Sequence, residues 1–345
     1  MVTKIAFFNH KGGVGKTTSL FNLGARLAQK GKNVLMIDAD TQCNLTLQIL
    51  GESGYETHYE QKPKNNIKSY LAPAFDSQPI LITAGECISA KIPNLYVMPG
   101  SLDLSGNDTQ LSMSFNLSSF LTSMQNLPGS FDYLIQKTAE KYNAEFVLID
   151  LNPSLSAINQ DLLISSDYFI IPTSTDYFSV QSIRSLATKL PEWENWAKKA
   201  RSLFKESFYP LPLNTPKFLG FTCNKFNLQE GGQPQKNHRQ MMDTIGKEID
   251  NLLVPNLKLA GMLLDDKFYH QYPRQTRNTQ SKYCLAEFSD YNKLSVISQQ
   301  KNIPLYDVAD SELIENQLIT KRWFADLYDY FANEIIIRTS NATSN

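Results

Sequence analysis

KIAFFNHKGGVGKTT, at residues 4–18, decides the fold of this 345-residue chain. It begins with a short apolar run that has aromatic and β-branched members, which is typical of a buried strand. After the glycine-rich loop, Leu20, Leu23 and Leu27 recur at spacings of three and four, as on the buried face of a helix. A second apolar run, VLMI at residues 34–37, predicts the next strand. Strand, loop, helix and strand in this order predict the opening of a parallel α/β sheet with a right-handed crossover.

The glycine loop indicates a phosphate-binding site. Gly12, Gly13 and Gly15 allow a sharp turn and leave the backbone amides open to an anion, because no Cβ blocks the approach. These amides and the positive end of the following helix form a cradle for phosphate. Lys16 would neutralise the β- and γ-phosphates, and the hydroxyl of Thr17 would bind Mg²⁺.

The loop departs from the standard phosphate-binding pattern at its start. His10 stands where GxxxxGK[ST] has its first glycine, and a second lysine, Lys11, follows it. KGGVGKTT resembles the deviant Walker A motif of the ParA/MinD family of ATPases. In that family the extra lysine, here Lys11, reaches across a dimer interface to the nucleotide of the other subunit. The resemblance implies ATP and Mg²⁺ as ligands, catalytic roles for Lys11 and Lys16, and nucleotide contacts from the whole loop: Lys11, Gly12, Gly13, Val14, Gly15, Lys16, Thr17 and Thr18.

A second motif lies just beyond residues 34–37. DADTQCN, at residues 38–44, resembles the family's DxDPQxN segment, with Thr41 in place of the usual proline. A carboxylate at the end of a strand that faces the loop can orient an attacking water or the magnesium shell, although such a residue can equally be a simple loop cap. By resemblance, Asp40 positions the water and contributes to the metal site, while Asp38 supports the loop.

Two further strand ends complete the predicted site. FVLI at residues 146–149 predicts a buried strand that ends at Asp150, and the following LNPS resembles the family's Walker B segment. That resemblance implies that Asp150 holds Mg²⁺ through water. FLGFTC at residues 218–223 predicts another strand, and Asn224 after it resembles the family's adenine-reading position.

The rest of the chain extends the same sheet. Apolar runs predict strands at residues 94–99 and 168–172 and a last strand at 259–264. Residues 51–93 and 226–300 are the least regular parts, and we expect mostly loops and short helices in the first of them. The whole pattern predicts one ParA-like α/β domain over residues 1–345, with a mostly parallel twisted sheet flanked by helices, and no preceding helix-turn-helix domain.

Composition limits the function. Hydrophobic residues make up 42% of the chain and charged residues 19%, which is typical of a globular protein. No apolar run approaches the roughly 18 residues of a membrane span, and the N-terminus does not resemble a secretory signal. The four cysteines are scattered, which argues against a disulfide framework or a zinc site. We therefore expect a cytoplasmic protein, associated with the nucleoid if it binds DNA.

Because the net charge is −1, any contact with DNA needs a local basic patch. Residues 198–239 hold eight Lys or Arg against two Glu, a net charge of +6, and a helix starting near Pro191 is expected to display part of this charge. Residues 267–282 hold four basic residues and no acidic one, a net charge of +4. Each stretch could equally be an ordinary solvated surface. The candidate DNA contacts are Lys198, Arg201, Lys205, Lys267, Arg274, Arg277 and Lys282.

The family resemblance implies a switch: an ATP-dependent homodimer that binds DNA without sequence preference, with hydrolysis stimulated by a ParB-like partner protein. Its function would be DNA partitioning or the positioning of another cargo. A MinD-like membrane ATPase is the alternative, but the final predicted helix ends with the single basic residue Arg338, which gives little attraction to anionic lipid. A metabolic or assembly enzyme on the same scaffold is a further alternative. The related tyrosine kinases fit less well, because Tyr328 and Tyr330 lie inside the final helix instead of a tail.

Overall fold

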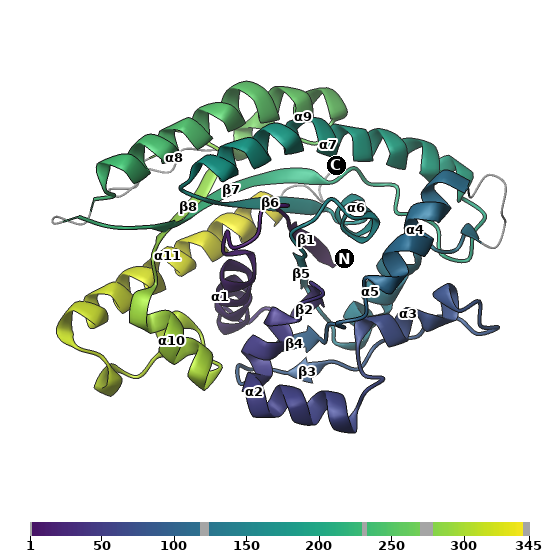
Figure 1. Cartoon of the computed structure of the whole chain (residues 1–345), viewed down its shortest axis with the longest axis horizontal. Helices are drawn as coiled ribbons and strands as arrows, with labels where there is room; N and C mark the ends of the chain where they lie inside the picture. The colour runs from purple at the N-terminus through teal and green to yellow at the C-terminus, as the bar shows by residue number, and fades with distance from the viewer. Residues whose placement is uncertain (1, 118–123, 230–232, 270–278, 341–345) are drawn as a thin grey trace.

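The computed structural model describes residues 2–117, 124–229, 233–269 and 279–340, and within them one twisted eight-stranded sheet forms the centre of the molecule (Figure 1). The strand order is β3-β4-β2-β5-β1-β6-β7-β8, and all neighbours are parallel except β3 and β4. The strands are β1 (Thr3–Phe7), β2 (Val34–Ala39), β3 (Ile88–Ser89), β4 (Leu95–Met98), β5 (Phe146–Leu151), β6 (Tyr168–Ser174), β7 (Lys217–Phe226) and β8 (Cys284–Ser289). The mostly parallel sheet predicted from the sequence is confirmed.

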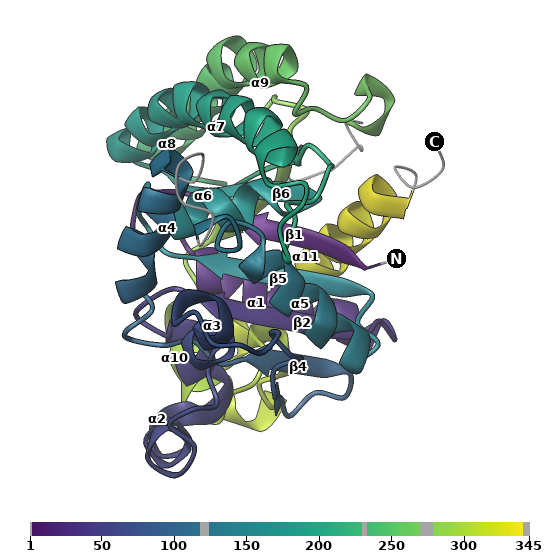
Figure 2. The same ribbon diagram turned by 90° about the vertical axis from the view of Figure 1, so that its right-hand side faces the viewer.

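Helices cover both faces of this sheet. α1 and α11 pack together on one face, α7 lies on the other, and α8 and α9 pack on the outside of α7 (Figures 1 and 2). The helices are α1 (Lys16–Gln29), α2 (Asn44–Gln61), α3 (Ile67–Phe75), α4 (Gly106–Leu117), α5 (Ser130–Lys141), α6 (Ala157–Ile164), α7 (Tyr177–Leu203), α8 (Lys236–Glu248), α9 (Val254–Ala260), α10 (Asn292–Lys301) and α11 (Glu315–Ser340).

The strand order places the predicted motifs side by side. β1 lies between β5 and β6, so the loops that follow these three strands meet at one edge of the sheet. β2 pairs with β5 in a register that puts Asp38 directly beside Asp150. Since every residue of β2 and β5 is buried, the sheet is apolar on both faces, as expected for parallel strands covered by helices. Ligands of such sheets bind at the carboxyl ends of the strands, which is the edge where these motifs gather.

The predicted last strand, residues 259–264, is wrong. Residues up to Ala260 belong to α9, which ends at Gly261 with the left-handed φ of 77°, and only Leu263 forms an isolated bridge to Phe218. The last strand is β8, which the apolar pattern did not reveal because Glu287 lies in its middle. Glu287 is 3% exposed, and its Oε1 accepts a hydrogen bond of 2.7 Å from the backbone amide of Thr279.

The predicted helix start near Pro191 is also wrong. α7 begins at Tyr177 and continues through Pro191 to Leu203, although proline lacks the amide donor and crowds the preceding turn. Packing explains the continuity, since Leu190 and Trp193 are buried on either side of the proline. The Trp193 ring lies 5.4 Å from that of Phe8, at the end of β1, so this part of α7 is fixed against the sheet.

The two regions expected to be irregular contain more regular structure than the sequence indicated. α2 reaches Gln61 and is broken only at Gly51, whose φ is 71°. α3 and the short β3 follow within residues 51–93, and residues 226–300 hold α8, α9, β8 and α10. The final helix is confirmed as α11, but Leu313 precedes it instead of starting it.

Candidate nucleotide-binding site

The glycine loop joins β1 to α1, and part of its backbone has a left-handed conformation that suits glycine. Gly13 and Gly15 have left-handed φ values of 74° and 84°, which other residues rarely adopt. A Cβ added to Gly13 would meet nothing within 4 Å, so this side of the loop faces free space. Within the described residues, the amides from Gly12 to Lys16 donate no hydrogen bond. The loop therefore offers several free donors at a helix N-terminus, which is the arrangement that binds phosphate.

Lys16 supplies a cation to this cradle. Its side chain is folded back across the loop, where Nζ lies 3.2 Å from the carbonyl oxygen of Asn9 and 3.5 Å from that of Lys11. Burial lowers the pKa of Lys16, while Asp150 and Asp40 act in the opposite direction. A phosphate in the cradle would give this buried charge a direct partner.

Carboxylate and hydroxyl oxygens from several side chains lie beside the loop. The hydroxyl of Thr17 donates to Oδ2 of Asp150 at 2.6 Å. Oδ2 of Asp38 accepts from the amide and the hydroxyl of Thr46 at 2.8 and 2.6 Å. Oδ1 of each aspartate is buried without a hydrogen-bond partner among the described residues.

Burial raises the pKa of Asp38 to about 8, with the neighbouring charge of Asp150 adding to the effect. Burial likewise raises the pKa of Asp150 to about 7, against the hydrogen bond from Thr17. Two adjacent buried carboxyl groups with unpaired oxygens are poorly stabilised as anions, and the charge of Lys16 offsets this only in part at Asp150. Carboxylate and hydroxyl oxygens are the ligands that Mg²⁺ prefers, so the residues present fit that ion.

Asp40 lies at the mouth of the same site. Its Oδ1 accepts a hydrogen bond of 3.0 Å from the amide of Gln42, and the residue is 6% exposed. This local bond fixes the turn after β2, and Asp40 is one of the residues that line the adjoining cleft.

The cleft runs from the glycine loop to the space between α2 and α10. Its volume is about 1130 Å³, which exceeds the range of roughly 300–1,000 Å³ for small-molecule sites, so a nucleotide can enter it. Its lining includes residues that no sequence motif indicated, because they come from α2, α10, the loop after β3 and the end of β7: Leu47, Val296, Gln299, Lys91 and Lys225.

Asn224 lies directly beneath the glycine loop. Its Nδ2 donates to the carbonyl oxygen of Val14 at 2.7 Å and to Oγ1 of Thr222 at 3.1 Å. Its side chain would be 3.4 Å from a Cβ on Gly15, so it supports the loop closely. Oδ1 of Asn224 has no hydrogen-bond partner among the described residues. The role of Asn224 in binding adenine stays a prediction. The structure adds that Asn224 supports the glycine loop through its bond to Val14.

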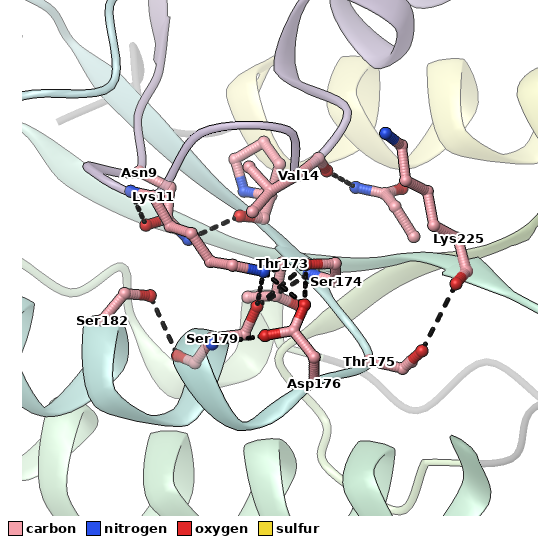
Figure 3. A network of polar contacts seen from close by, with 12 residues as sticks. Asn9, Lys11, Val14, Thr173, Ser174, Thr175, Asp176, Ser179, Ser182 and Lys225 are labelled. Atoms are coloured by element: carbon pink, nitrogen blue, oxygen red, sulfur yellow. Dashed lines mark hydrogen bonds and ion pairs between the residues drawn. The ribbon is translucent and has the colours of Figure 1, made fainter.

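Lys11 does not line the cleft in the single chain. Its side chain extends to the start of α7, where Nζ forms an ion pair with Asp176 and a hydrogen bond of 2.5 Å with Oγ of Ser174 (Figure 3). Burial acts to raise the pKa of Asp176, but the bonds from Lys11 and Ser174 hold it below its usual value. Sequence reasoning missed Asp176, although Asp is a typical N-cap residue and its side chain here accepts from the backbone amide of Ser179.

The first basic stretch is only partly available to a ligand. The Arg201 side chain is 9% exposed and pairs with Glu194, which is 0% exposed, at 2.8 Å. Arg201 also donates to the carbonyl oxygens of Pro212 and Asn214, so its guanidinium is used inside the fold, and the prediction that it contacts DNA from an exposed face is wrong. Lys198 donates to the carbonyl oxygen of Ala260 at 3.0 Å, while Lys205 is exposed.

In the second stretch, Lys282 pairs with Asp266 at 2.5 Å, so part of its charge is neutralised within the chain. Lys267 lies 3.5 Å from Asp265. Arg274 and Arg277 lie outside the described residues. In the part of the chain that the structure describes, no helix is both long and apolar enough to cross a membrane.

A parallel sheet with a glycine loop between its central strand and the first helix, and with buried aspartates at the neighbouring strand ends, defines a P-loop nucleotide-binding protein. Residues 2–201 match the family model described as an AAA domain, which covers more than half of the chain. The chain therefore belongs to that family, and within it to the ParA-like P-loop ATPases.

Individual relatives agree with this assignment. The chain is 28% identical over 199 residues to the chromosome-partitioning ATPase Soj of Treponema pallidum, a match that covers 58% of this chain and 68% of that protein. Matches to the curated relatives span between 50% and 83% of the relatives' own length.

Two solved structures share the fold. An ATP complex of a Cyanothece McdA variant superposes with a TM-score of 0.58 at 17% identity, covering 97% of this chain and 96% of that one. pNOB8 ParA bound to nonspecific DNA superposes with a TM-score of 0.57 at 18% identity, covering 99% of each chain.

Proposed function

We propose that this protein is an ATP-driven dimerising switch that binds DNA in its dimeric state and partitions DNA or positions another cargo. The observation that carries the proposal is the glycine loop with two lysines. Lys16 is folded over the loop of its own chain, whereas Lys11 extends away from the cleft and is free to serve a different site once its present contacts are broken.

Within one chain, each residue has a distinct task. The amides from Gly12 to Thr18 and the ammonium of Lys16 would hold the phosphates of ATP. Thr17 and Asp150 would hold Mg²⁺, which when bound neutralises charge between the phosphates. Asp40 would accept a hydrogen bond from the attacking water and so orient it toward the γ-phosphate.

Lys11 is proposed to act across the dimer. A lysine from each subunit would stabilise charge on the phosphoryl group in the other subunit's site, so each copy completes its partner's site. Bound ATP then favours the dimer through contacts that ADP lacks, which is how a γ-phosphate biases a two-state assembly. The Soj relative is named a chromosome-partitioning ATPase, and pNOB8 ParA was solved on nonspecific DNA, which supports the proposed cargo. A ParB-like protein is the proposed activator of hydrolysis.

The end of α11 argues against the membrane-bound alternative. Arg338, the basic residue of its last turn, is 1% exposed, pairs with Glu334 at 3.0 Å, and donates to the carbonyl oxygen of Leu219 at 2.6 Å. Because this cation is used inside the fold, it is not available to an anionic lipid.

Calorimetric titration with ATPγS and Mg²⁺ tests the site. Lys16→Ala should lose detectable binding, because the phosphates lose their only buried cation partner in the described loop. Lys64→Ala, which removes an exposed lysine away from the cleft, serves as the matched control and should bind like the wild type. Unchanged ATPγS affinity in Lys16→Ala would place the nucleotide elsewhere.

Co-sedimentation with double-stranded DNA tests the cargo. We expect binding with ATPγS, little with ADP or without nucleotide, and a steep fall in affinity with salt as counterions are released. Replacing Arg274 and Arg277 with Glu should weaken binding and flatten that salt dependence. DNA binding that is equal in all three nucleotide conditions would rule out the switch, and an unchanged salt slope in the variant would move the DNA contact to another patch.

A further inference from the structure

The far end of the nucleotide cleft is bounded by a contact between its two walls. α2 and α10 pack against each other there (Figures 1 and 2). Gln48 and Gly51 of α2 line the cleft on one side, and Gln299 of α10 and Asn302, at the end of that helix, line it on the other. A nucleotide with its phosphates in the glycine loop would extend toward this end, because the cleft runs in that direction.

α2 is broken at the point of this contact. Gly51 has φ 71° and ψ 171°, so the helix is interrupted in its middle. The side-chain amide of Asn302 lies against the break: a Cβ on Gly51 would be 2.6 Å from Nδ2 of Asn302, closer than such atoms approach in proteins. Nδ2 also lies 3.5 Å from the carbonyl oxygen of Ile49. The missing side chain of Gly51 is therefore what lets Asn302 fit into the break.

Asn302 is itself held in a defined conformation. It ends α10 with a left-handed φ of 56°, which asparagine adopts more readily than most residues. Just beyond it, the amide of Leu305 donates to Oδ1 of Asn22 at 2.9 Å, and the hydroxyl of Tyr306 donates to the carbonyl oxygen of Asn22 at 2.8 Å. Asn22 lies on α1, the helix that follows the glycine loop. The wall formed by α10 is thus anchored to the helix that begins at the phosphate site.

The wall formed by α2 is anchored to the sheet at its start, where Thr46 donates to Asp38. Toward the break, Gln48 lies one turn before Gly51 on the same side of the helix. Nε2 of Gln48 and Oδ1 of Asn302 are both buried without a hydrogen-bond partner among the described residues. Because one is a donor and the other an acceptor, a small movement of α2 toward α10 can pair them and remove the cost of two unsatisfied groups.

We propose that Asn302 is a positioning residue: seated in the break of α2, it holds the two walls of the cleft together and slows the release of a bound nucleotide. This inference rests on the proposed function, because it requires a nucleotide in the cleft. Asn302 need not touch the nucleotide, since it acts through the distance between α2 and α10. Without its side chain, α2 can move away from α10, and a wider cleft releases its ligand faster.

Asn302→Gly is the informative variant, because glycine adopts a left-handed φ at a helix end and only the side chain is lost. Asn143→Gly is the matched control: Asn143 has a left-handed φ of 50°, follows the end of α5 and is not among the residues that line the cleft. Gly51→Ala disturbs the same contact from the other wall, because its Cβ would collide with Nδ2 of Asn302. Thermal unfolding confirms that each variant folds.

Two measurements separate the contact from its effect on the nucleotide. Hydrogen exchange of the α2 amides around Gly51, followed by mass spectrometry on the nucleotide-free chain, reports the contact alone. Release of radiolabelled ADP into an excess of unlabelled ADP reports the effect, and ADP is used because the chain is expected to stay single with it. For Asn302→Gly we expect faster exchange, and ADP release faster by about three- to tenfold, the size of one lost polar contact. Asn143→Gly should change neither.

Gly51→Ala should also speed ADP release, partly through backbone strain at a left-handed φ and partly through the collision with Asn302. Only the collision is relieved when Asn302→Gly is present as well. Gly51→Ala should therefore have a smaller effect on ADP release in the Asn302→Gly background than in the wild type. Equal effects in the two backgrounds would show that the two residues do not act on each other, and would overturn the proposal.

Unchanged exchange of α2 in Asn302→Gly would overturn the contact itself. Faster exchange with unchanged ADP release would overturn its role in holding the nucleotide, while the nucleotide site would stand. A wild-type chain that binds neither ADP nor ATPγS would refute the proposed nucleotide site, and this role of Asn302 with it.

Discussion

Asp161, on α6, shows at the scale of one residue how burial without a partner differs from burial at a ligand site. It is 0% exposed, and neither carboxylate oxygen has a hydrogen-bond partner among the described residues. Burial and the nearby charge of Asp132 raise its pKa well above the usual value. Unlike Asp38 and Asp150, Asp161 does not adjoin the glycine loop. Its burial therefore lowers the stability of the fold whether or not a nucleotide is bound.

Asp161→Asn should stabilise the protein at neutral pH. The unfolded Asp161 loses its proton near pH 4, but the folded one keeps it to a higher pH, so the wild type loses stability as pH rises above about 4. The loss approaches about 1.4 kcal/mol per pH unit until the raised folded pKa is reached. Urea unfolding of both proteins at pH 4 and pH 7 should therefore show a small difference at pH 4 and a larger one at pH 7.

Asp326→Asn, at an exposed position on α11, is the control and should leave the pH dependence unchanged. Identical pH profiles for wild type and Asp161→Asn would mean that Asp161 is ionised in the fold.

Prediction at the residue scale worked where a motif is local. The residues of the glycine loop, with Asp38, Asp40 and Asp150, lie together at one edge of the sheet because each is at or just after the carboxyl end of a parallel strand. The partner of Lys11 could not be predicted this way, because Asp176 is 165 residues away along the chain. Only the strand order, with β6 beside β1, shows that the two meet.

α7 shows at the scale of elements how tertiary packing overrides local sequence. Pro191 predicts a helix start, yet the helix passes through it because the residues around it are buried against the sheet. The same packing changes the meaning of the basic residues at the end of the helix. Spacing alone puts Lys198, Arg201 and Lys205 on one face, whereas the structure buries Arg201 against Glu194 and leaves Lys205 exposed.

Arg201→Met should destabilise the fold by roughly 3–5 kcal/mol, because it leaves Glu194 buried without its cation. Hydrogen bonds from Arg201 to the carbonyl oxygens of Pro212 and Asn214, at 2.8 and 2.6 Å, are lost as well. Lys205→Met, the exposed counterpart, should change stability by less than about 0.5 kcal/mol. Guanidinium unfolding measures both. Equal, small effects from the two substitutions would show that the pair contributes nothing to stability.

The presence of a buried strand was easier to predict than the number of strands or the residues at which each strand begins and ends. Uniformly apolar runs such as those of β2 and β5 stand out, because both faces of a parallel strand are buried. β8 was missed because it carries the buried Glu287. The run at residues 259–264 has the apolar composition of a strand, but most of it belongs to the end of α9 and the turn after it.

For the whole molecule, two copies are proposed to make one functional unit. In the single chain, Lys11 pairs with Asp176 and does not line the cleft that holds the glycine loop. A second copy would have to draw Lys11 away from Asp176, and the γ-phosphate is the group that could compensate for that loss. In the proposed switch, Lys11 would exchange Asp176 for a phosphate bound by the other copy.

Sedimentation velocity of wild type and Lys11→Ala with ATPγS or ADP, each with Mg²⁺, tests this claim most directly. We expect the wild type to sediment at twice the mass of one chain with ATPγS and as a single chain with ADP. Lys11→Ala should bind ATPγS, as calorimetry can verify, yet remain a single chain, while the control Lys64→Ala should dimerise like the wild type. An ATPγS-dependent dimer of Lys11→Ala that is as stable as the wild-type dimer would contradict the account.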